Sequence, residues 1–332
     1  MVRSDETPAA RCASSWAPCI NSVIKAIPRV VAAVRWRTEE DLKLIDVALA
    51  TCSLLPDLDA DERLLIPALE AHGVTAVPRV WDDPSVRWDD FRLIVIRSAW
   101  DYAPRRDAFL AWCSSLPRVL NSVPVITWNT DKSYLRTLAT AGVPTVPTTW
   151  VGADSATASF RLPEGQLVIK PAISSGAQHT SRYPSDDHAA ARMHIDRLVM
   201  SGREVMVQPY VSSIDSHGET GLIYIDGVFS HAIRKGPLLH APGAATDHLW
   251  ALEDITPRVA DADELALAKR VLDELPWPRR ELLYARVDLV RGSDGAPLVL
   301  ELELAEPSLF LGLGSGAASR LAAAIAVRLG QD

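Results

Sequence analysis

The sequence predicts a mixed α/β (α+β) protein, with an open α/β domain first and a larger region built on hairpins after it. Three observations predict this. Apolar strands alternate with a helical segment across residues 42–97. Two Asp-Gly turns, near residues 226 and 294, lie between alternating runs. The 332 residues are 48% hydrophobic and 23% charged, which is typical of a globular protein with a sizeable core.

Residues 1–41 differ from the rest of the chain. They are rich in Ala, Ser and Pro, and their basic stretch is interrupted by Pro28. On composition we interpret them as a disordered extension rather than as a docking or targeting arm.

An N-terminal domain is expected over residues 42–126. Leu42–Thr51 is predicted to be a buried strand, and the helix after it has an acidic first turn and ends at Gly73. Val74–Val80 and Phe91–Arg97 are the next strands. Phe91–Arg97 is nearly all apolar, as in a parallel sheet that is covered on both faces.

Polar and aromatic residues follow that last strand directly, at Arg97, Trp100, Asp101 and Tyr102. Ligands of open α/β sheets bind beyond the carboxyl ends of the strands, so these four residues are candidate substrate contacts. A loop that is merely packed by its aromatic side chains is an equally open interpretation.

The middle of the chain places two lysines at element ends. Val125–Trp128 is predicted to be a short strand, and a helix from Asp131 carries Lys132 and stops at Gly142. The predicted strand Gln166–Lys170 ends in a second lysine, before a loop of small residues at Ser174–Ala177. Lysine suits phosphate as a point charge, and small residues allow backbone N–H groups to approach it. Glu204–Val211 is the next predicted strand.

The first hairpin joins Gly218–Tyr224 to Val228–Lys235 through a turn at Asp226-Gly227. Counting from the turn pairs Glu219 with Arg234. Lys235 then falls on the opposite face, unless the strand contains a bulge.

The second hairpin joins Leu282–Val290 to Pro297–Leu304, with a two-residue type I′ turn expected at Asp294-Gly295. This register pairs Asp288 with Glu301 and Arg286 with Glu303, and it puts Leu300 on the apolar face. Like charges that face each other cost stability, so we expect a cation there, and oxygen-only ligands favour Mg²⁺ or Mn²⁺. The alternative is an exposed strand face with an Arg286–Glu303 salt bridge.

Several functions are disfavoured by composition. A net charge of -8 argues against a general nucleic-acid or anionic-membrane binder. Four scattered cysteines indicate reduced thiols and a cytoplasmic location, and without 18 consecutive apolar residues we expect no membrane span. A nicotinamide-dependent oxidoreductase is disfavoured because no GxGxxG follows the first strand.

The order of these parts resembles the ATP-grasp superfamily over about residues 42–328. The matching motifs are Thr130-Asp-Lys132, Val168-Ile-Lys170-Pro171, Val207-Gln-Pro-Tyr-Val211, Arg286-Val-Asp288 and Glu301-Leu-Glu303. Within it the chain resembles the branch that closes the D-cycloserine ring from O-ureido-serine, through Arg97–Tyr102, Trp128–Lys132, Ser230–Lys235 and Glu306–Phe310. The resemblance implies a two-lobed ATP-grasp fold over residues 127–330 after the pre-ATP-grasp domain, with an ATP lobe at about 145–211 and a metal and substrate lobe at about 212–330.

The resemblance also implies roles for individual residues, with ATP and Mg²⁺ (or Mn²⁺) as cofactors. Nucleotide contacts are expected from Lys132, Lys170, Ser175, Gly176, Gln208, Tyr210 and Val211. Metal ligands are expected at Asp288, Glu301 and Glu303, and catalytic groups at Glu219, Arg234 and Arg286, with Glu219 orienting Arg234. Lys235, Glu306 and Ser308 join Arg97, Trp100, Asp101 and Tyr102 as expected substrate contacts.

The implied activity is that of an ATP-dependent carboxylate–amine ligase, which forms an acyl phosphate on a small amino-acid-like substrate. Ring closure of the D-cycloserine type, from O-ureido-D-serine, is one form of it. The alternative is a nucleotide-binding module or sensor without ligase chemistry. The expected partners are a small-molecule substrate and a second copy of the chain in a homodimer, with neither nucleic acid nor membrane.

Overall fold

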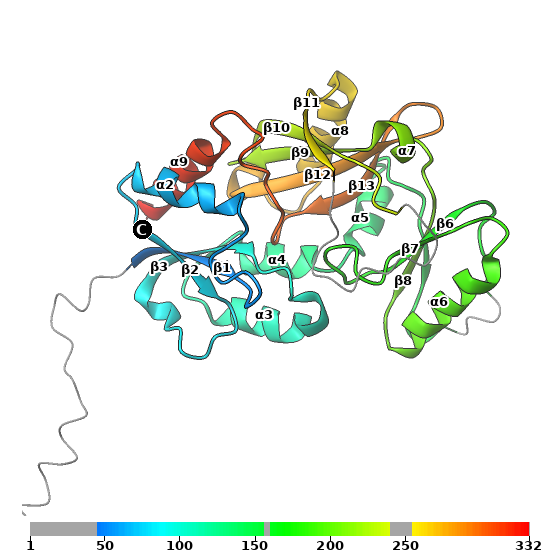
Figure 1. The fold of residues 1–332 in the computed structure, drawn as a ribbon, viewed down its shortest axis with the longest axis horizontal. Helices are drawn as coiled ribbons and strands as arrows, with labels where there is room; N and C mark the ends of the chain where they lie inside the picture. Colours follow the sequence, from blue (N-terminus) through cyan, green and yellow to red (C-terminus); the bar gives the residue numbers. More distant parts are fainter. Residues whose placement is uncertain (1–44, 156–159, 240–253, 332) are drawn as a thin grey trace, which may run out of the picture. The chain divides into compact units, whose positions relative to one another are not determined.

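The computed structural model describes residues 45–155, 160–239 and 254–331, and the extension predicted over 1–41 lies outside them (Figure 1). The described residues contain three sheets, and all of them belong to one compact unit. The mixed α/β prediction is therefore confirmed. The predicted domain boundary between residues 126 and 127 falls inside a helix, and that division stays a prediction.

The N-terminal sheet is parallel and has the order β2-β1-β3-β4. Its strands are β1 (Ile45–Thr51), β2 (Ala76–Val80), β3 (Phe91–Ser98) and β4 (Val119–Leu120). The helices α2 (Leu65–Glu70) and α9 (Ala317–Leu329) cover one face, and α3 (Arg106–Ser115) and α4 (Val123–Asn129) cover the other (Figure 1). Burial on both faces explains why β3 is almost entirely apolar.

The predicted strand Val125–Trp128 is wrong, because these residues lie in α4. Pro124 occupies the first turn of the helix, where a missing N–H costs nothing. Consecutive Val125 and Ile126 are both buried, which a helix wedged between two layers allows and a strand with one buried face does not. At the end of α4 the Asn129 side chain bonds the backbone N–H groups of Leu304 and Ala305 at 2.6 and 3.1 Å.

The ATP-lobe region contains a small antiparallel sheet in the order β5-β8-β6-β7, packed on α6. Its elements are β5 (Thr149–Val151), β6 (Leu167–Pro171), β7 (Ser181–Tyr183), α6 (His188–Met200) and β8 (Val205–Pro209). The helix after Lys132 is α5 (Tyr134–Thr140), so Lys132 lies in the turn before it.

The largest sheet has the order β11-β10-β9-β12-β13. Its elements are α7 (Ile214–His217), β9 (Glu219–Ile225), β10 (Val228–Lys235), β11 (Ile255–Arg258), α8 (Ala262–Asp273), β12 (Tyr284–Arg291) and β13 (Pro297–Glu303). One face packs on α5 and α8. On the other face, Ile223, Ile233 and Tyr284 pack against α9, whereas the continuation of the same face is charged.

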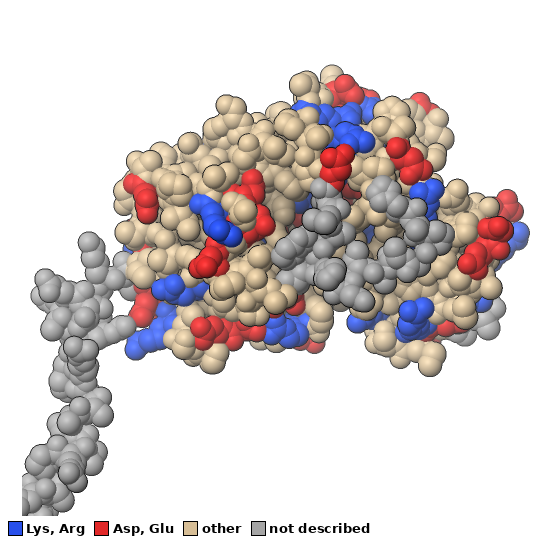
Figure 2. All heavy atoms as spheres, in the orientation of Figure 1, with Lys and Arg blue, Asp and Glu red and all other residues tan. Residues whose placement is uncertain are grey.

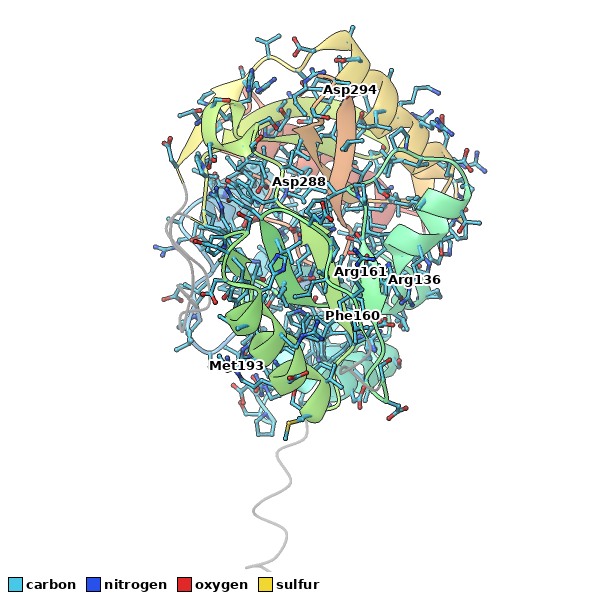
Figure 3. All side chains as sticks on the ribbon, turned by 90° about the vertical axis from the view of Figure 1, so that its right-hand side faces the viewer. Arg136, Phe160, Arg161, Met193, Asp288 and Asp294 are labelled. Atoms are coloured by element: carbon cyan, nitrogen blue, oxygen red, sulfur yellow. The ribbon has the colours of Figure 1, made fainter. Side chains whose placement is uncertain are left out.

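The second hairpin has the predicted charged pairs but not the predicted turn. Asp288 pairs with Glu301 and Arg286 with Glu303, as expected. The turn is a three-residue loop, because Gly292 N–H bonds the carbonyl of Ala296 and only Gly295 has a positive φ. An extra residue in β13, at Leu300, restores the register beyond it. Leu300 consequently lines a cavity instead of joining the apolar face. Figure 3 shows Asp294 at the outer tip of this hairpin and Asp288 in the interior.

The first hairpin has the predicted Asp226-Gly227 turn, with positive φ at both residues, but its register shifts at Ser230. That bulge pairs Glu219 with Lys235 and moves Arg234 opposite Thr220. The predicted Glu219–Arg234 pair is therefore wrong. A single extra residue exchanges the faces of all side chains beyond it.

Arg97 is not a substrate contact, because it is fully buried. Its guanidinium forms an ion pair with Glu62, which is also buried, and bonds the Pro307 carbonyl at 2.8 Å. Asp61 next to Glu62 accepts hydrogen bonds from the backbone N–H groups of Leu311 and Gly312 at 2.6 and 2.7 Å. The N-terminal domain thereby holds the loop that follows β13.

Acidic and basic side chains are interspersed on the face shown in Figure 2. None of the helices in the described ranges is long and apolar enough to cross a membrane. Cys52 and Cys113 are buried free thiols.

We expect Arg97→Met to lower the free energy of unfolding by about 3–5 kcal/mol, because it leaves the Glu62 carboxylate buried without a partner. The double variant Arg97→Met/Glu62→Leu should recover most of this loss. Urea denaturation measures both. Arg87→Met removes an exposed ion pair with Asp90 and is the control, with an expected change below about 0.5 kcal/mol. A loss below about 1 kcal/mol in Arg97→Met would contradict the structural role assigned to this pair.

Candidate active site

A cavity of about 420 Å³ lies where the three sheets meet. Its lining includes most of the predicted site residues, namely Trp100, Tyr102, Lys132, Lys170, Ser175, Gly176, Gln208, Tyr210, Val211, Glu219, Lys235, Arg286, Glu301, Glu303, Glu306 and Ser308. It also includes Asp59, Asn129, Leu300 and Phe310, which were not among the predicted site residues. The predicted residues therefore converge, although they come from elements far apart in the sequence.

Two buried lysines line this cavity near Glu301. Lys132 is held by its backbone N–H, which bonds the Ala172 carbonyl at 2.9 Å, and its Nζ bonds the Ser174 carbonyl at 2.6 Å. The Lys132 Nζ also lies 3.1 Å from Glu301 Oε1. Burial lowers the pKa of Lys170, and the neighbouring Lys132 lowers it further, against the attraction of Glu301. Two such cations at one wall suit a polyanion such as a triphosphate.

The small-residue loop connects to the N-terminal domain. Ser175 Oγ donates to the Trp100 carbonyl at 2.8 Å, and Gly176 has a positive φ of 56°. Ser174, Ser175 and Gly176 all line the cavity beside the lysines. The loop is thus placed where its backbone N–H groups lie close to a bound anion.

The end of β8 forms a mixed polar and apolar wall. Gln208 Nε2 donates to Thr148 Oγ1 at 2.8 Å, and the Tyr210 N–H bonds the Gln166 carbonyl at 2.8 Å. The Tyr210 ring stacks against Arg182, with the guanidinium carbon 3.4 Å from the ring centroid. Apolar cavity residues nearby on the same sheet and on β13 include Val168, Leu300 and Leu302. A flat, weakly polar ring such as a purine suits this wall.

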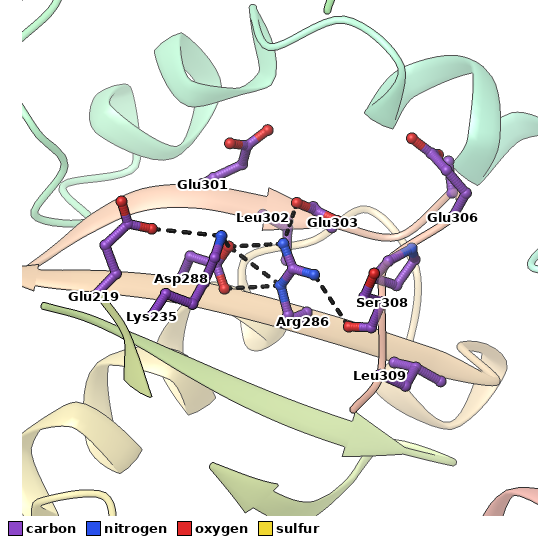
Figure 4. A network of polar contacts seen from close by, with 12 residues as sticks. Glu219, Lys235, Arg286, Asp288, Glu301, Leu302, Glu303, Glu306, Ser308 and Leu309 are labelled. Carbon is purple, nitrogen blue, oxygen red and sulfur yellow. Dashed lines mark hydrogen bonds and ion pairs between the residues drawn. The ribbon is translucent and has the colours of Figure 1, made fainter. Parts of the chain in front are cut away.

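Arg286 is the centre of the polar network in Figure 4. Its Nε and Nη2 bond both oxygens of Asp288 at 2.9–3.2 Å, its Nη2 also bonds Glu303, and its Nη1 bonds the Ser308 carbonyl at 3.0 Å. Gly221 lies opposite Asp288 on β9, and a Cβ there would be 3.1 Å from Asp288 Oδ1. Glycine at position 221 therefore leaves room for the ion pair between Arg286 and Asp288.

Lys235 occupies the position that the sequence analysis gave to Arg234. Because of the Ser230 bulge, the Lys235 Nζ atom lies 3.6 Å from Glu219 Oε2 and 3.5 Å from Asp288 Oδ2. Arg234 instead bonds the His217 carbonyl at 2.9 Å and pairs with Asp254 at 3.5 Å, and it does not line the cavity. This geometry does not support the catalytic role that was predicted for Arg234.

Asp101 also has a structural contact instead of a cavity contact. It accepts a hydrogen bond from Trp81 Nε1 at 2.8 Å and pairs with Arg105, and it does not line the cavity. Trp100 and Tyr102 do line it, and Trp100 Nε1 donates to the Glu306 carbonyl at 3.0 Å. Of the four candidates at the end of β3 and directly after it, Trp100 and Tyr102 remain candidate substrate contacts.

The carboxylates differ in their electrostatic environment. Lys132 and Lys170 lower the pKa of Glu301 to about 2, despite burial. Burial raises the pKa of Glu303 to about 7, with contributions from Glu301 and Asp288, although Arg286 opposes them. Burial and the nearby Glu303 raise the pKa of Glu306 to about 8. Negative charge is therefore crowded at this end of the cavity.

A divalent metal fits Glu301 and Glu303, whose side chains are about a quarter exposed and line the cavity. Magnesium bound with nucleotides commonly uses one or two carboxylates plus phosphate oxygens, so three protein ligands are not required. Within the described ranges, no group of three His, Cys, Asp or Glu side chains could hold a metal ion. Both oxygens of Asp288 are bonded to Arg286, so its predicted role as a ligand would require it to exchange one of those bonds.

We expect binding of ATP to be accompanied by proton uptake at alkaline pH. Bound phosphate would raise the lowered pKa of Lys170, so the affinity for ATP falls as the pH rises through the pKa of Lys170 in the free protein. Calorimetry in buffers of different ionisation enthalpy measures the number of protons taken up. The pH is kept well above the phosphate pKa of about 6, so that the phosphates of ATP do not contribute. Lys170→Met should abolish it, whereas Lys269→Met, at an exposed pair with Asp273, should not. Equal uptake by wild type and Lys170→Met would contradict the assignment.

Comparisons with known proteins agree with this geometry. A family model described as the N-terminal domain of D-cycloserine synthetase DcsG matches residues 47–121. The cycloserine biosynthesis protein DcsG of Streptomyces lavendulae is 40% identical over 301 residues, which cover 85% of this chain and 98% of that protein. The crystal structure of D-cycloserine synthetase DcsG aligns with a TM-score of 0.76 at 38% identity, covering 85% of this chain and 99% of the other.

More distant structures share the fold. The D-alanine–D-alanine ligase of Bacillus anthracis, in a complex with ATP, has a TM-score of 0.55 at 15% identity and covers 86% of this chain and 98% of its own. The ATP-grasp ligase PsnB, in a complex with Mg and ADP, has a TM-score of 0.55 at 19% identity, with 86% and 97% covered. ATP-grasp ligases use ATP and a divalent metal. With two fifths of its residues shared over almost the whole length of DcsG, the chain belongs to the DcsG family of ATP-grasp ligases.

Proposed function

We propose that this ligase activates the carboxylate of a small amino-acid-like substrate as an acyl phosphate and closes a ring by attack of a nitrogen of the same molecule. The reaction would be the conversion of O-ureido-D-serine to D-cycloserine, in antibiotic biosynthesis. Phosphate leaves with one carboxyl oxygen as the ring nitrogen attacks, and hydrolysis removes the carbamoyl group from that nitrogen as carbon dioxide and ammonia. Support comes from the 40% identity with a protein whose name places it in cycloserine biosynthesis, over 98% of that protein. Homodimer formation stays a prediction.

The observation that carries the proposal is one cavity that is lined by cations and carboxylates in direct contact with each other. Lys132, Lys170, Lys235 and Arg286 supply the positive charge, and Glu301 and Glu303 lie beside Lys132 and Arg286. Transfer of a phosphoryl group depends mainly on positioning and on neutralising the charge of the phosphates. The alternative of a sensor without ligase chemistry is disfavoured by membership of a ligase family.

Each side chain has a role that follows from its position. Lys132 and Lys170 hold phosphates, and Lys235 takes the role that was expected of Arg234 at the transferred group. Glu219, which lies beside Lys235, orients the Lys235 ammonium. Ser175 and Gly176 belong to the loop that excludes water, which would otherwise hydrolyse the acyl phosphate.

Glu301 and Glu303 would hold the metal ion, which when bound neutralises negative charge on the phosphates. Arg286 keeps Asp288 and Glu303 in place on the same face of the sheet. The Arg286 guanidinium also lines the cavity beside Ser308, where it faces the substrate carboxylate in this proposal.

Lys235→Met should lower kcat/KM about 100- to 1000-fold, because one positive charge opposite the developing negative charge is lost. Arg234→Met is the matched control on the next residue of the same strand, and its effect should be less than about fivefold. Steady-state assays of ADP release give both values. The bulge-based assignment is refuted if Arg234→Met is the more damaging substitution.

The activity itself is tested by ADP release and by mass spectrometry of products, with O-ureido-D-serine, its L-enantiomer, common amino acids and dipeptides as substrates. Hydroxylamine should trap the acyl phosphate as a hydroxamate. Glu301→Gln should reduce turnover by at least about 100-fold while leaving the fold intact, whereas Glu281→Gln, at an exposed position, should be unaffected. If D-cycloserine never forms although another substrate releases ADP, the proposed substrate is wrong and the ligase class stands.

A further inference from the structure

The loop after β13 is fixed from several sides and carries a carboxylate into the cavity. Trp100 Nε1 bonds the carbonyl of Glu306 at 3.0 Å, and Arg97 bonds the next carbonyl, that of Pro307, at 2.8 Å. Arg286 bonds the carbonyl of Ser308 at 3.0 Å. Three consecutive backbone carbonyls are thus each held by a side chain, so the position of Glu306 is determined before any substrate binds.

The Glu306 side chain has no cationic partner among the described residues. Lys132 lowers its pKa through space without forming an ion pair, and the Tyr102 hydroxyl lies close enough to lower it as well. Glu303, a second carboxylate, is close enough to raise its pKa. Figure 4 shows Glu306 directed away from the Arg286 network, toward α4. A buried carboxylate without a counter-charge is costly, and a cation from outside the protein would offset that cost.

A metal ion is a poor candidate for this cation. Hard divalent cations take six or more oxygen ligands, and the metal of the proposed reaction is already assigned to Glu301 and Glu303, where phosphate oxygens complete its coordination. A tyrosine hydroxyl and a single carboxylate instead match an ammonium group, which donates three hydrogen bonds and needs only a few acceptors.

The spacing also fits a small amino acid. Ser308 touches Arg286 through its carbonyl, and Glu306 is two residues earlier, so their Cα atoms are at most about 7 Å apart. In an amino acid the carboxylate and the ammonium are attached to one carbon. A substrate whose carboxylate faces Arg286 can therefore place its ammonium on the Glu306 side of the loop.

We propose that the Glu306 carboxylate, supported by Tyr102, binds the ammonium group of the substrate and thereby selects an α-amino acid over a simple carboxylic acid. This inference rests on the proposed function and adds a specificity determinant to it. Burial and the neighbouring Glu303 raise the pKa of Glu306, which reflects the cost of a charge at this position, and a bound ammonium group would offset that cost.

The test compares O-ureido-D-serine with its des-amino counterpart, 3-(carbamoylaminooxy)propanoate, by calorimetry in the presence of a non-hydrolysable ATP analogue and a divalent metal. Wild type should bind the amino compound about 100-fold more tightly. Glu306→Gln, which preserves shape, should reduce this preference below about fivefold by weakening only the amino compound. Tyr102→Phe should reduce it partially, and Glu281→Gln should keep it. Unchanged affinity for the ATP analogue shows that each variant is folded.

Binding is measured without product formation, so the result does not depend on ring closure. If wild type shows the preference but forms no D-cycloserine when ATP is supplied, the proposed reaction fails while the ammonium site stands. A preference that survives in Glu306→Gln overturns the ammonium site, as does an equal loss of affinity for both compounds. If wild type binds neither compound, the substrate class and the site are both overturned.

Discussion

Repulsion between carboxylates is the constraint that the rest of this structure has to satisfy. Glu219, Glu301, Glu303 and Glu306 line one cavity, and the buried Asp288 carboxylate lies behind it between Arg286 and Lys235. The compensating cations come from separate places in the chain: the turn before α5, and the strands β6, β10 and β12. The charge balance therefore joins the small sheet, through Lys170 on β6, to the large sheet, through Lys235 on β10 and Arg286 on β12. The packing of the layers and the charge balance of the site therefore depend on each other.

Two bulges adjust the large sheet to this constraint. The extra residue at Ser230 turns Lys235 toward Glu219 and Asp288 and directs Arg234 outward. The extra residue at Leu300 keeps Asp288 opposite Glu301 although the turn is longer by one residue, and it moves an apolar side chain into the cavity. In both strands a bulge determines which side chains point into the cavity, and the strand pairing on either side of the bulge stays regular.

Much of the site was predictable, because strand alternation and the order of motifs are local properties. The pairs Asp288–Glu301 and Arg286–Glu303 agree with counting from a two-residue turn because the extra residue at Leu300 offsets the longer turn. The two lysines follow from the end of one predicted strand and the start of one predicted helix. The bulge at Ser230 has no sequence signature, so the roles of Arg234 and Lys235 were exchanged. Arg97 was misplaced for a different reason: its partner Glu62 lies 35 residues earlier, and only the packed structure shows that the two are buried together.

The loop that follows β13 is held in part by residues from much earlier in the chain. Asp61, Arg97 and Trp100 bond backbone groups more than 200 residues away in the sequence. The two regions therefore cannot diverge independently. An exchange of the N-terminal domain between relatives would transfer these anchors without the loop that they fit, and a mutation that alters the loop would need a matching change far upstream. Substrate preference in such a chain depends on both regions, so directed evolution would have to vary the two regions together.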